Sequence, residues 1–296
     1  MLRFDQFPLQ IVKRIPAPFD GDEWLFEIKH DGFRALGIRD GGSARMYTRN
    51  GYDISRRHQH ITSALAALPA ERFVLDGELV VLDPDGRSDF AKLAHGRTGT
   101  HYYAFDLLML GNADLRAKPL EARKAALARL LSASGEPVRY CDHIVGQGKA
   151  FFEAVREAGL EGMVAKRLRS PYAGTLKEDW LKVKCLRSHD FVVGGWIPND
   201  TGQIRTLLLG EFVDGDLRYL GQVGSPSARV MRAVVRVLSP RAESPFKDAI
   251  REPGAKFCEP TIRIGVEFLD FTDDGYLRHP AFRRFDDEII TVLRDL

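Results

Sequence analysis

Cysteine is scarce in this chain of 296 residues. The three that occur, Cys141, Cys185 and Cys258, are odd in number and widely separated. Such a set argues against a disulfide framework, and its spacing does not match that of a zinc site. We therefore expect free thiols in a reducing, cytoplasmic environment.

Long apolar runs and a strong net charge are also missing. The run at Tyr102–Leu110 is interrupted by Asp106 and is far shorter than the roughly 20 apolar residues of a membrane helix. The N-terminus lacks a signal-peptide pattern, so we expect no membrane association. A net charge of only +2 does not indicate a nucleic-acid partner. Local clusters could still form a basic face, namely Arg56-Arg57, Lys166–Arg169 and Arg283-Arg284.

The most informative stretch is Glu27–Arg34, in which a lysine ends an apolar strand and a tight polar turn follows. Strand formers precede Lys29 and Asp31-Gly32 is a turn signal, so Lys29 should point into a cleft. An amine attacks only when neutral, so its pKa, ordinarily near 10.4, must be lowered by burial or by neighbouring cations. Taken alone, the stretch also suits a surface lysine before a hairpin turn.

Two further strand-like segments carry carboxylates in unexpected places. Phe73–Leu82 is strongly β-prone, yet Asp76 and Glu78 lie at its centre, where buried charges need partners. A hairpin turn at the glycine after Asp76 is the alternative. A later apolar strand places Phe105 beside Asp106 in the same way, and ordinary core packing would also explain this aromatic residue.

A pair of lysines follows on another expected strand. Trp180–Lys184 alternates at period two, so Lys182 and Lys184 share one face, roughly 6–7 Å apart. Two like charges so arranged need solvent or an anion between them. Exposure to solvent is the plain alternative, but the apolar opposite face favours a half-buried strand beside a polyanion cleft. These lysines would also be the cations that Lys29 requires.

Hydrophobic residues make up 44% of the chain, which is enough for two domains at this length. Helices and strands mix up to Arg187, and short strands with glycine turns follow, so we predict domains 1–187 and 188–296. In the first we expect three helices: one capped by Ser55 and running to Leu68, one at 120–131 and one at 149–158. In the second we expect strands at 191–196, 205–212, 217–223 and 261–271 with a helix at 228–238, which suits a small OB-type barrel.

Five stretches, in order along the chain, resemble the motifs of the nucleotidyltransferase superfamily of ATP-dependent DNA ligases, RNA ligases and mRNA capping enzymes. They are Lys29–Arg34, Asp76–Glu78, Phe105-Asp106, Glu161–Lys166 and Lys182–Lys184. The segments that look most like the ligase domain of bacterial end-joining ligases and their small stand-alone relatives are 48–51, 207–210, 221–224 and 277–282. The resemblance covers nearly the whole chain. It implies an α+β fold, with an adenylyltransferase domain of antiparallel sheets and a C-terminal OB-fold β-barrel.

The resemblance implies an ATP-dependent DNA ligase that seals 5′-phosphate/3′-hydroxyl nicks in DNA repair. Lys29 would attack the α-phosphate of ATP to give lysyl-AMP, the AMP would move to a DNA 5′-phosphate, and the 3′-hydroxyl would displace it. Each step is phosphoryl transfer, in which positioning and charge neutralisation dominate. The other implied roles are Lys182 and Lys184 on the α-phosphate, Glu161 on Mg²⁺ or Mn²⁺, Glu78 on the ribose hydroxyls, Phe105 stacked on adenine, Glu27 on the adenine amino group, and Arg34 and Arg49 on the ribose side or the DNA 5′-phosphate.

The tail departs from the family pattern. The resemblance implies a C-terminal arginine that contacts the pyrophosphate of ATP, and we assign this role to Arg284 with Arg278 as the second cation. The carboxylates at 286–288 oppose the charge such a site needs. The second domain would swing about 187–190, closing on ATP for the first step and turning another face to DNA afterwards.

Two other classes of function stay open. An RNA ligase or a capping-type guanylyltransferase would need RNA or GTP, and the subgroup segments weigh against both. A non-catalytic OB-type nucleic-acid binder would form no covalent adenylate. For a ligase, the expected partners are nicked duplex DNA and a DNA end-binding or repair protein, and we expect the protein to be a monomer.

Overall fold

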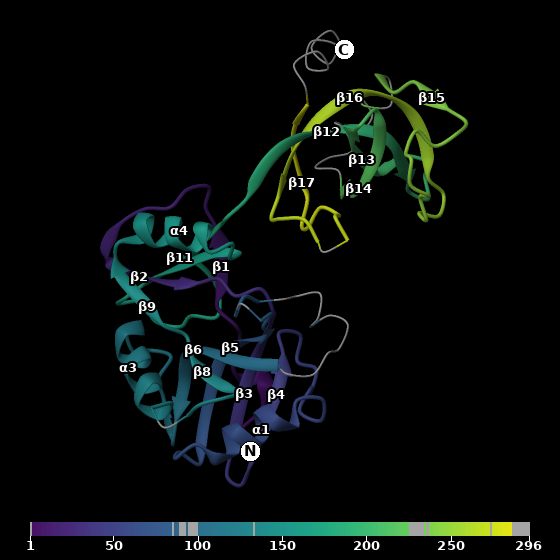
Figure 1. Cartoon of the computed structure of the whole chain (residues 1–296). Coiled ribbons are helices and arrows are strands. Elements are labelled where there is room, and N and C mark those ends of the chain that lie inside the picture. Colours follow the sequence, from purple (N-terminus) through teal and green to yellow (C-terminus); the bar gives the residue numbers. More distant parts are fainter. Residues whose placement is uncertain are drawn as a thin grey trace. The chain divides into compact units, whose positions relative to one another are not determined.

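The computed structural model describes residues 2–285, with gaps at 85, 89–92, 94–99, 133, 225–233, 235–236 and 273. The chain divides into two compact units, Met1–Cys185 and Leu186–Leu296 (Figure 1). Each unit has its own hydrophobic core. The division falls close to the domain boundary that the sequence predicts after Arg187.

The first unit contains two β-sheets. One has the strand order β1-β11-β10-β2-β9, in which only the β1–β11 pairing is parallel. Its strands are β1 (Ile11–Arg14), β2 (Gly21–Ile28), β9 (His143–Gly146), β10 (Gly162–Arg167) and β11 (Leu176–Lys184). The other has the order β4-β3-β5-β6-β7, with β8 parallel to β6. Its strands are β3 (Phe33–Asp40), β4 (Ser43–Thr48), β5 (Arg72–Val81), β6 (Thr100–Leu110), β7 (Ala113–Asp114) and β8 (Val138–Tyr140).

Helices cover the outer face of each sheet, so the two inner faces meet. Helix α1 (Gln59–Ala67) packs on β4, α3 (Leu120–Leu130) packs on β6, and α4 (Gly148–Glu157) packs on β10 and β2. A short 3₁₀ helix, η1 (Phe4–Gln6), precedes β1. A cluster that includes Leu36, Val74 and Trp180 fills part of the space between the sheets. The period-two alternation of the strands thus sends one set of side chains toward the helices and the other toward the opposite sheet.

The expected helices at 120–131 and 149–158 are confirmed, but the first helix begins later than expected. Helix α1 starts at Gln59 after His58, and no side chain caps it. The hydroxyl of Ser55 instead accepts a hydrogen bond from the N–H of Met46, at 3.0 Å. The sequence could not distinguish a cap from a contact with a strand nine residues away, because serine serves both.

Strand β5 runs without a break through Asp76 and Glu78, so the alternative of a hairpin turn there is wrong. The glycine between them has a packing reason. A Cβ atom on Gly77 would lie 2.6 Å from the ring of Tyr102 and from the carbonyl oxygen of Tyr103 on β6. The absence of a side chain lets β6 approach, so this glycine belongs to a strand interior.

The second unit is a small barrel of strands. Its sheet has the order β14-β13-β12-β16-β15, and β17 pairs with β16. The strands are β12 (Arg187–Pro198), β13 (Ile204–Val213), β14 (Asp216–Gly224), β15 (Pro240–Arg241), β16 (Lys256–Phe268) and β17 (Ala281–Phe285). Each expected strand is present, although β16 starts five residues before the predicted strand and ends three before its end. The expected helix at 228–238 lies mostly outside the described residues.

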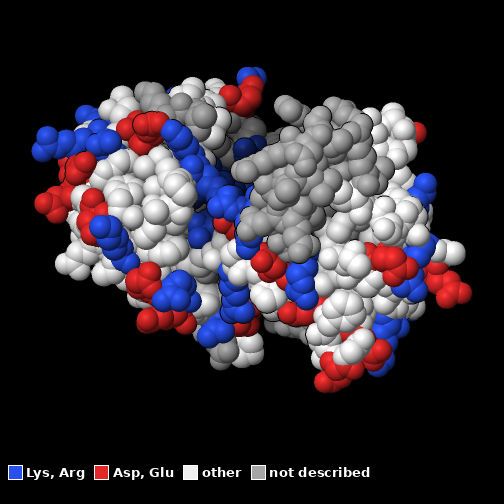
Figure 2. Space-filling view, turned by 90° about the horizontal axis from the view of Figure 1, so that it is seen from above, with Lys and Arg blue, Asp and Glu red and all other residues white. Residues whose placement is uncertain are grey.

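Surface charge is mixed, as the small net charge of +2 leads one to expect. Figure 2 shows Lys and Arg side chains interspersed with Asp and Glu over the described part of this face. Among the described residues, no helix combines the length and the apolar character needed to cross a bilayer.

Candidate active site

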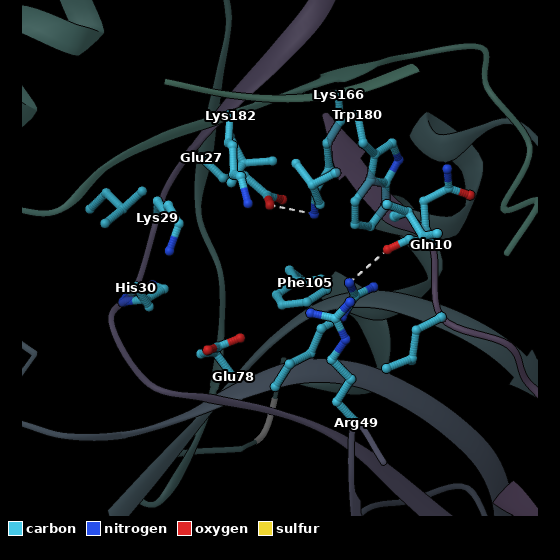
Figure 3. Close-up of a pocket in the computed structure, with 16 residues that line it drawn as sticks. Gln10, Glu27, Lys29, His30, Arg49, Glu78, Phe105, Lys166, Trp180 and Lys182 are labelled. Atoms are coloured by element: carbon cyan, nitrogen blue, oxygen red, sulfur yellow. Dashed lines mark hydrogen bonds and ion pairs between the residues drawn. The ribbon is translucent and has the colours of Figure 1, made fainter. Parts of the chain in front are cut away.

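A pocket of about 250 Å³ lies between the two sheets of the first unit. Strands β2, β10 and β11 line one side, strands β3, β5 and β6 line the other, and residues 9–12 complete the wall. Figure 3 shows charged side chains of both signs pointing into the same space around Phe105. A concave site with convergent polar groups is a candidate for ligand binding.

Lys29 follows the last residue of β2, as the sequence predicts. Its backbone N–H donates to the carbonyl of Gly162 at the start of β10, at 2.8 Å, which fixes where the side chain leaves the sheet. The side chain is 21% exposed, lines the pocket and forms an ion pair with Glu161. The reading as a surface lysine before a hairpin turn is therefore wrong.

Glu161 lies between two lysines. One carboxylate oxygen pairs with Lys29, and the other is 2.9 Å from Nζ of Lys184. Burial raises the pKa of Glu161, but the two ammonium groups outweigh burial and lower it overall. The carboxylate is therefore ionised at neutral pH.

Lys182 is a pocket cation that is available to a ligand. It lies opposite Val164 on β10, and Lys184 lies opposite Gly162, so the two lysines share one strand face as predicted. Lys182 lines the pocket, and its Nζ has no hydrogen bond or ion pair with the described residues. Burial, together with the charges of Lys29 and Lys184, lowers the pKa of Lys182. Such an unpaired cation beside Lys29 suits an anionic group.

Glu27 lies deeper in the same sheet, with its carboxylate 2% exposed between two other lysines. Oε1 is 2.6 Å from Nζ of Lys124, and Oε2 is 2.5 Å from Nζ of Lys166. Burial raises the pKa of Glu27, and the ammonium groups lower it by more than burial raises it. Glu27 and Lys166 line the pocket, whereas Lys124 reaches Glu27 from α3 without lining it.

Arg34 on β3 lines the opposite side of the pocket, and the buried carboxylate of Asp76 holds its guanidinium. The two contacts are 3.0 Å from Nε to Oδ1 and 2.6 Å from Nη2 to Oδ2. Arg34 also donates to the carbonyl of Gln10 at 2.7 Å, and the hydroxyl of Tyr172 donates to Asp76 at 2.7 Å. The buried carboxylate in mid-strand therefore has the partners that its burial requires.

Glu78 lies opposite Arg34 in the β3–β5 register and lines the pocket. Burial raises the pKa of Glu78 to about 8, although Lys29 and Arg34 oppose the shift. Within the described part of the chain, its carboxylate forms no hydrogen bond or ion pair. Arg49, in the turn after β4, contributes an exposed cation to the same wall.

The rings of His30, Phe105 and Trp180 also line the pocket. Phe105 on β6 has Nζ of Lys166 at 4.2 Å from its ring centroid, and Trp180 packs edge-on against it at 6.0 Å. His30 stacks on Tyr103 with 4.2 Å between ring centroids. Burial lowers the pKa of His30 to about 4, so its imidazole is neutral at pH 7.

Most of the sequence-predicted site residues meet in this pocket. Those that line it are Glu27, Lys29, Arg34, Arg49, Glu78, Phe105 and Lys182. Glu161 and Lys184 adjoin it through the ion pair with Lys29. Arg284 belongs to the second unit, on β17, where its Nη2 is 2.8 Å from Oδ2 of Asp190. Its contact with ATP stays a prediction, and the carboxylates at 286–288 lie outside the described residues.

Sequence reasoning assigned no role to several residues that shape the pocket. Lys166 belongs to one of the motifs, but the sequence did not predict its ion pair with Glu27. No sequence pattern indicated that Gln10 and Trp180 line the pocket. Lys124 offered a faint signal, because it lies at helical spacing from Leu120 and Leu127, whose stripe indicates the buried face of the helix expected at 120–131. His30 carries no distinguishing sequence pattern beyond its place in the turn after Lys29.

The donor set fits a magnesium ion bound together with a phosphate ligand. Among the described residues, no group of three or more His, Cys, Asp or Glu side chains could hold a metal. Mg²⁺ commonly uses only one or two carboxylates, with substrate phosphates and water as its other ligands. Glu161 is the carboxylate near Lys29 that could serve, since its ion pairs with Lys29 and Lys184 outweigh burial and keep it ionised, whereas burial keeps Glu78 protonated at neutral pH.

Two facing sheets around a lysine-rich pocket, followed by an OB-type barrel, define the class of nucleotidyltransferases. The comparisons give the family. Residues 8–184 match the ATP dependent DNA ligase domain, and residues 200–288 match the ATP dependent DNA ligase C terminal region. The chain therefore belongs to the ATP-dependent DNA ligase family.

Curated relatives point the same way. The multifunctional non-homologous end joining protein LigD of Pseudomonas aeruginosa is 36% identical over 277 residues, which cover 88% of this chain and 33% of that protein. DNA ligase C1 of Mycolicibacterium smegmatis is 32% identical, over 83% of this chain and 75% of that protein. The chain spans only a third or slightly more of the length of the LigD relatives.

Solved structures share the fold. The ligase domain from M. tuberculosis LigD is 28% identical, with a TM-score of 0.59 and 97% of each chain covered. A Lig E DNA ligase, at 20% identity, gives a TM-score of 0.65 over 94% of this chain. The expected α+β fold, with a nucleotidyltransferase domain followed by an OB-type domain, is confirmed.

Proposed function

We propose that this protein seals 5′-phosphate/3′-hydroxyl nicks in duplex DNA through a lysyl-AMP intermediate on Lys29. The observation that carries the proposal is the position of Lys29 in the pocket, paired with Glu161 and close to Lys182, which has no partner among the residues that the structure describes. This arrangement supports the proposal, because Lys29 would be the nucleophile and Lys182 the cation that receives a phosphate. The family membership of the chain supports the same chemistry.

The first step joins AMP to Lys29 in the pocket. The Nζ of Lys29, once it has lost a proton, attacks the α-phosphorus of ATP. A P–N bond forms, the P–O bond to the β-phosphate breaks, and pyrophosphate leaves. Lys182 and Lys184 neutralise the charge that develops on the phosphoryl oxygens, which is the main catalytic requirement of phosphoryl transfer.

The next two steps use DNA. An oxygen of the 5′-phosphate attacks the phosphorus of lysyl-AMP, the P–N bond breaks, and Lys29 takes up a proton. The 3′-hydroxyl then loses its proton and attacks the phosphorus of the 5′-phosphate, which forms the phosphodiester and releases AMP. Arg49, which is exposed at the pocket wall, would hold the 5′-phosphate.

The remaining side chains bind and orient ATP. Phe105 would stack on adenine, Glu27 would accept from its amino group, Glu78 would accept from the ribose hydroxyls, and Arg34 would lie on the ribose side. Glu161 would hold Mg²⁺ or Mn²⁺, which when bound neutralises phosphate charge. Arg284 would contact the departing pyrophosphate.

We infer that the substrate arises in DNA repair. The relatives that are named non-homologous end joining proteins support this context, and the chain corresponds to about a third of their length. A DNA end-binding or repair protein would then deliver the nicked duplex.

The experiment that tests the function uses a duplex with one 5′-phosphate nick. ATP should support sealing, and sealing should weaken steeply as salt rises, because phosphate contacts dominate binding. A preference for nicked RNA or for GTP would instead indicate an RNA ligase or a guanylyltransferase. Binding without any covalent adenylate would indicate a non-catalytic nucleic-acid binder.

A further inference from the structure

A charge triad, Lys124–Glu27–Lys166, lies buried behind the base side of the pocket. Lys124 is 2% exposed, and its Nζ donates to Oε1 of Glu27 at 2.6 Å and to the carbonyl of Cys141 at 2.7 Å. The same atom lies 4.1 Å from the ring centroid of Tyr140. These three contacts hold the ammonium group of Lys124 in place, and all of them are buried.

Fold stability is a weak reason for such an arrangement. Replacing a buried ion pair by apolar residues of similar size is often neutral or stabilising, because taking the charges out of water is costly. On α3, Lys124 is buried with leucines and with Arg123, and the charged group that its ammonium meets is the carboxylate of Glu27. The one pocket-lining group among its partners is Glu27.

Fixing a carboxylate has a chemical consequence at a base-binding site. An ionised carboxylate only accepts hydrogen bonds. Adenine presents an amino donor at the edge where guanine presents a carbonyl acceptor. A carboxylate that is held ionised and in one orientation therefore attracts adenine and repels guanine.

We propose that Lys124 is a positioning residue for base selection, which holds Oε1 of Glu27 from behind the pocket so that the site takes ATP and rejects GTP. This inference rests on the proposed function, since it assumes that the pocket binds a nucleoside triphosphate with its base near Glu27. Figure 3 shows Glu27 paired with Lys166 close to Phe105, the ring proposed to stack on the base.

Loss of Lys124 would change the pocket in two ways. Glu27 would keep only Lys166, on the pocket side, and its carboxylate would be free to turn. Burial would then raise the pKa of Glu27 with less opposition, because one of the two charges that lower it is gone. A protonated carboxyl group donates, so it could pair with the carbonyl of guanine.

The test measures self-adenylation and self-guanylation of Lys124→Met, with kcat/KM for ATP and for GTP. Lys118→Met is the matched control, since Lys118 is an exposed lysine just before the same helix. We expect the ATP preference to fall about tenfold or more in Lys124→Met, because sites built on hydrogen-bond matching owe large selectivity to it. Lys118→Met should keep the wild-type ratio.

A second readout separates positioning from a structural role. In Lys124→Met, the acid limb of the pH profile of kcat/KM for ATP should move to higher pH. Lys124→Arg keeps the positive charge, so it should retain much of the wild-type preference for ATP over GTP. If Lys124→Met does not fold, Lys124→Gln, which keeps a donor without the charge, is assayed in the same way.

The outcomes are distinct. A folded Lys124→Met or Lys124→Gln with the wild-type ATP to GTP ratio overturns the inference. A wild-type protein that labels equally from ATP and GTP also overturns it, and leaves the lysyl-nucleotide chemistry standing. A wild-type protein that takes no label from either nucleotide contradicts the proposed function itself.

Discussion

Lys29 and Glu161 are 132 residues apart in the chain, and their side chains form an ion pair at the pocket. The β2–β10 pairing brings them together, because it sets Ile28 opposite Met163. In this pair the Nζ of Lys29 donates to Glu161, so the contact must break before the amine can attack. The phosphates of ATP would give Lys184 a new anionic partner, which would release Glu161 from both lysines and leave it free to hold a metal ion.

The first prediction concerns Glu161. Glu161→Gln keeps the shape of the side chain but removes its charge, so self-adenylation should fall by about a hundredfold or more, the usual size of losing one preorganised electrostatic contact. Glu153→Gln is the control, because Glu153 is an exposed carboxylate paired with Arg156 on α4. Rates are compared over a Mg²⁺ titration. Full activity of Glu161→Gln at ordinary Mg²⁺ would rule out the metal role.

The second prediction concerns Phe105. Phe105→Ala should raise the KM for ATP in self-adenylation while changing the rate at saturating ATP little, since stacking on a base is worth about 1–3 kcal/mol. Phe105→Leu keeps apolar bulk without an aromatic face, so its KM should rise as well. An unchanged KM in both variants would show that adenine does not stack on this ring.

The third prediction uses the pKa of Glu78, which burial raises from 4.5 to about 8. Between these two pH values the folded protein keeps a proton on Glu78, whereas the unfolded chain has lost it. The contribution of this proton to the free energy of unfolding is full below about pH 4.5 and is lost as the pH rises through 8. Glu78→Gln removes this dependence.

Thermal unfolding midpoints of the wild type and of Glu78→Gln at pH 5 and pH 8.5 check the third prediction. The unfolding midpoint of Glu78→Gln relative to that of the wild type should be higher at pH 8.5 than at pH 5. Glu121→Gln, an exposed carboxylate on α3, should show no such trend. A constant difference between wild type and Glu78→Gln would mean that Glu78 titrates normally.

The fourth prediction concerns Arg284. Its loss should slow self-adenylation by about ten- to a hundredfold, the value of one charge-assisted contact, and should affect sealing of nicks that already carry a 5′-adenylate much less. Arg283→Ala is the matched control, because Arg283 lies on the same strand and pairs with Glu267 at 2.6 Å. Equal losses of Arg284→Ala in both assays would refute a role confined to the first step.

Local patterns sufficed for the parts of the fold and site that depend on neighbours in sequence. Alternation predicted that Lys182 and Lys184 share a face, and the apolar run before Lys29 predicted that it ends a strand. Both follow from strand geometry alone, so no knowledge of the other sheet was needed.

Contacts between distant segments could not be predicted in this way. The partners of Glu27 come from α3 and from β10, and the partner of Asp76 comes from β3. Periodicity gives the face on which a side chain lies, but it does not give the element that covers this face. For the same reason the sequence predicted that the lysines bind phosphate, but it did not predict that Lys29 and Lys184 form ion pairs with Glu161 in the free protein.

The central claim is that Lys29 becomes covalently bound to AMP. The most direct measurement incubates the protein with ATP labelled at the α-phosphate, denatures it, and locates the label by peptide mapping. We predict one labelled peptide, which contains Lys29. Pyrophosphate added before denaturation should remove the label, because it reverses the reaction. Folded Lys29→Ala and Lys29→Arg should carry no label, since an amine at this position is required to form the phosphoramidate. Label at another residue, or a Lys29→Arg protein that still labels, would contradict the account.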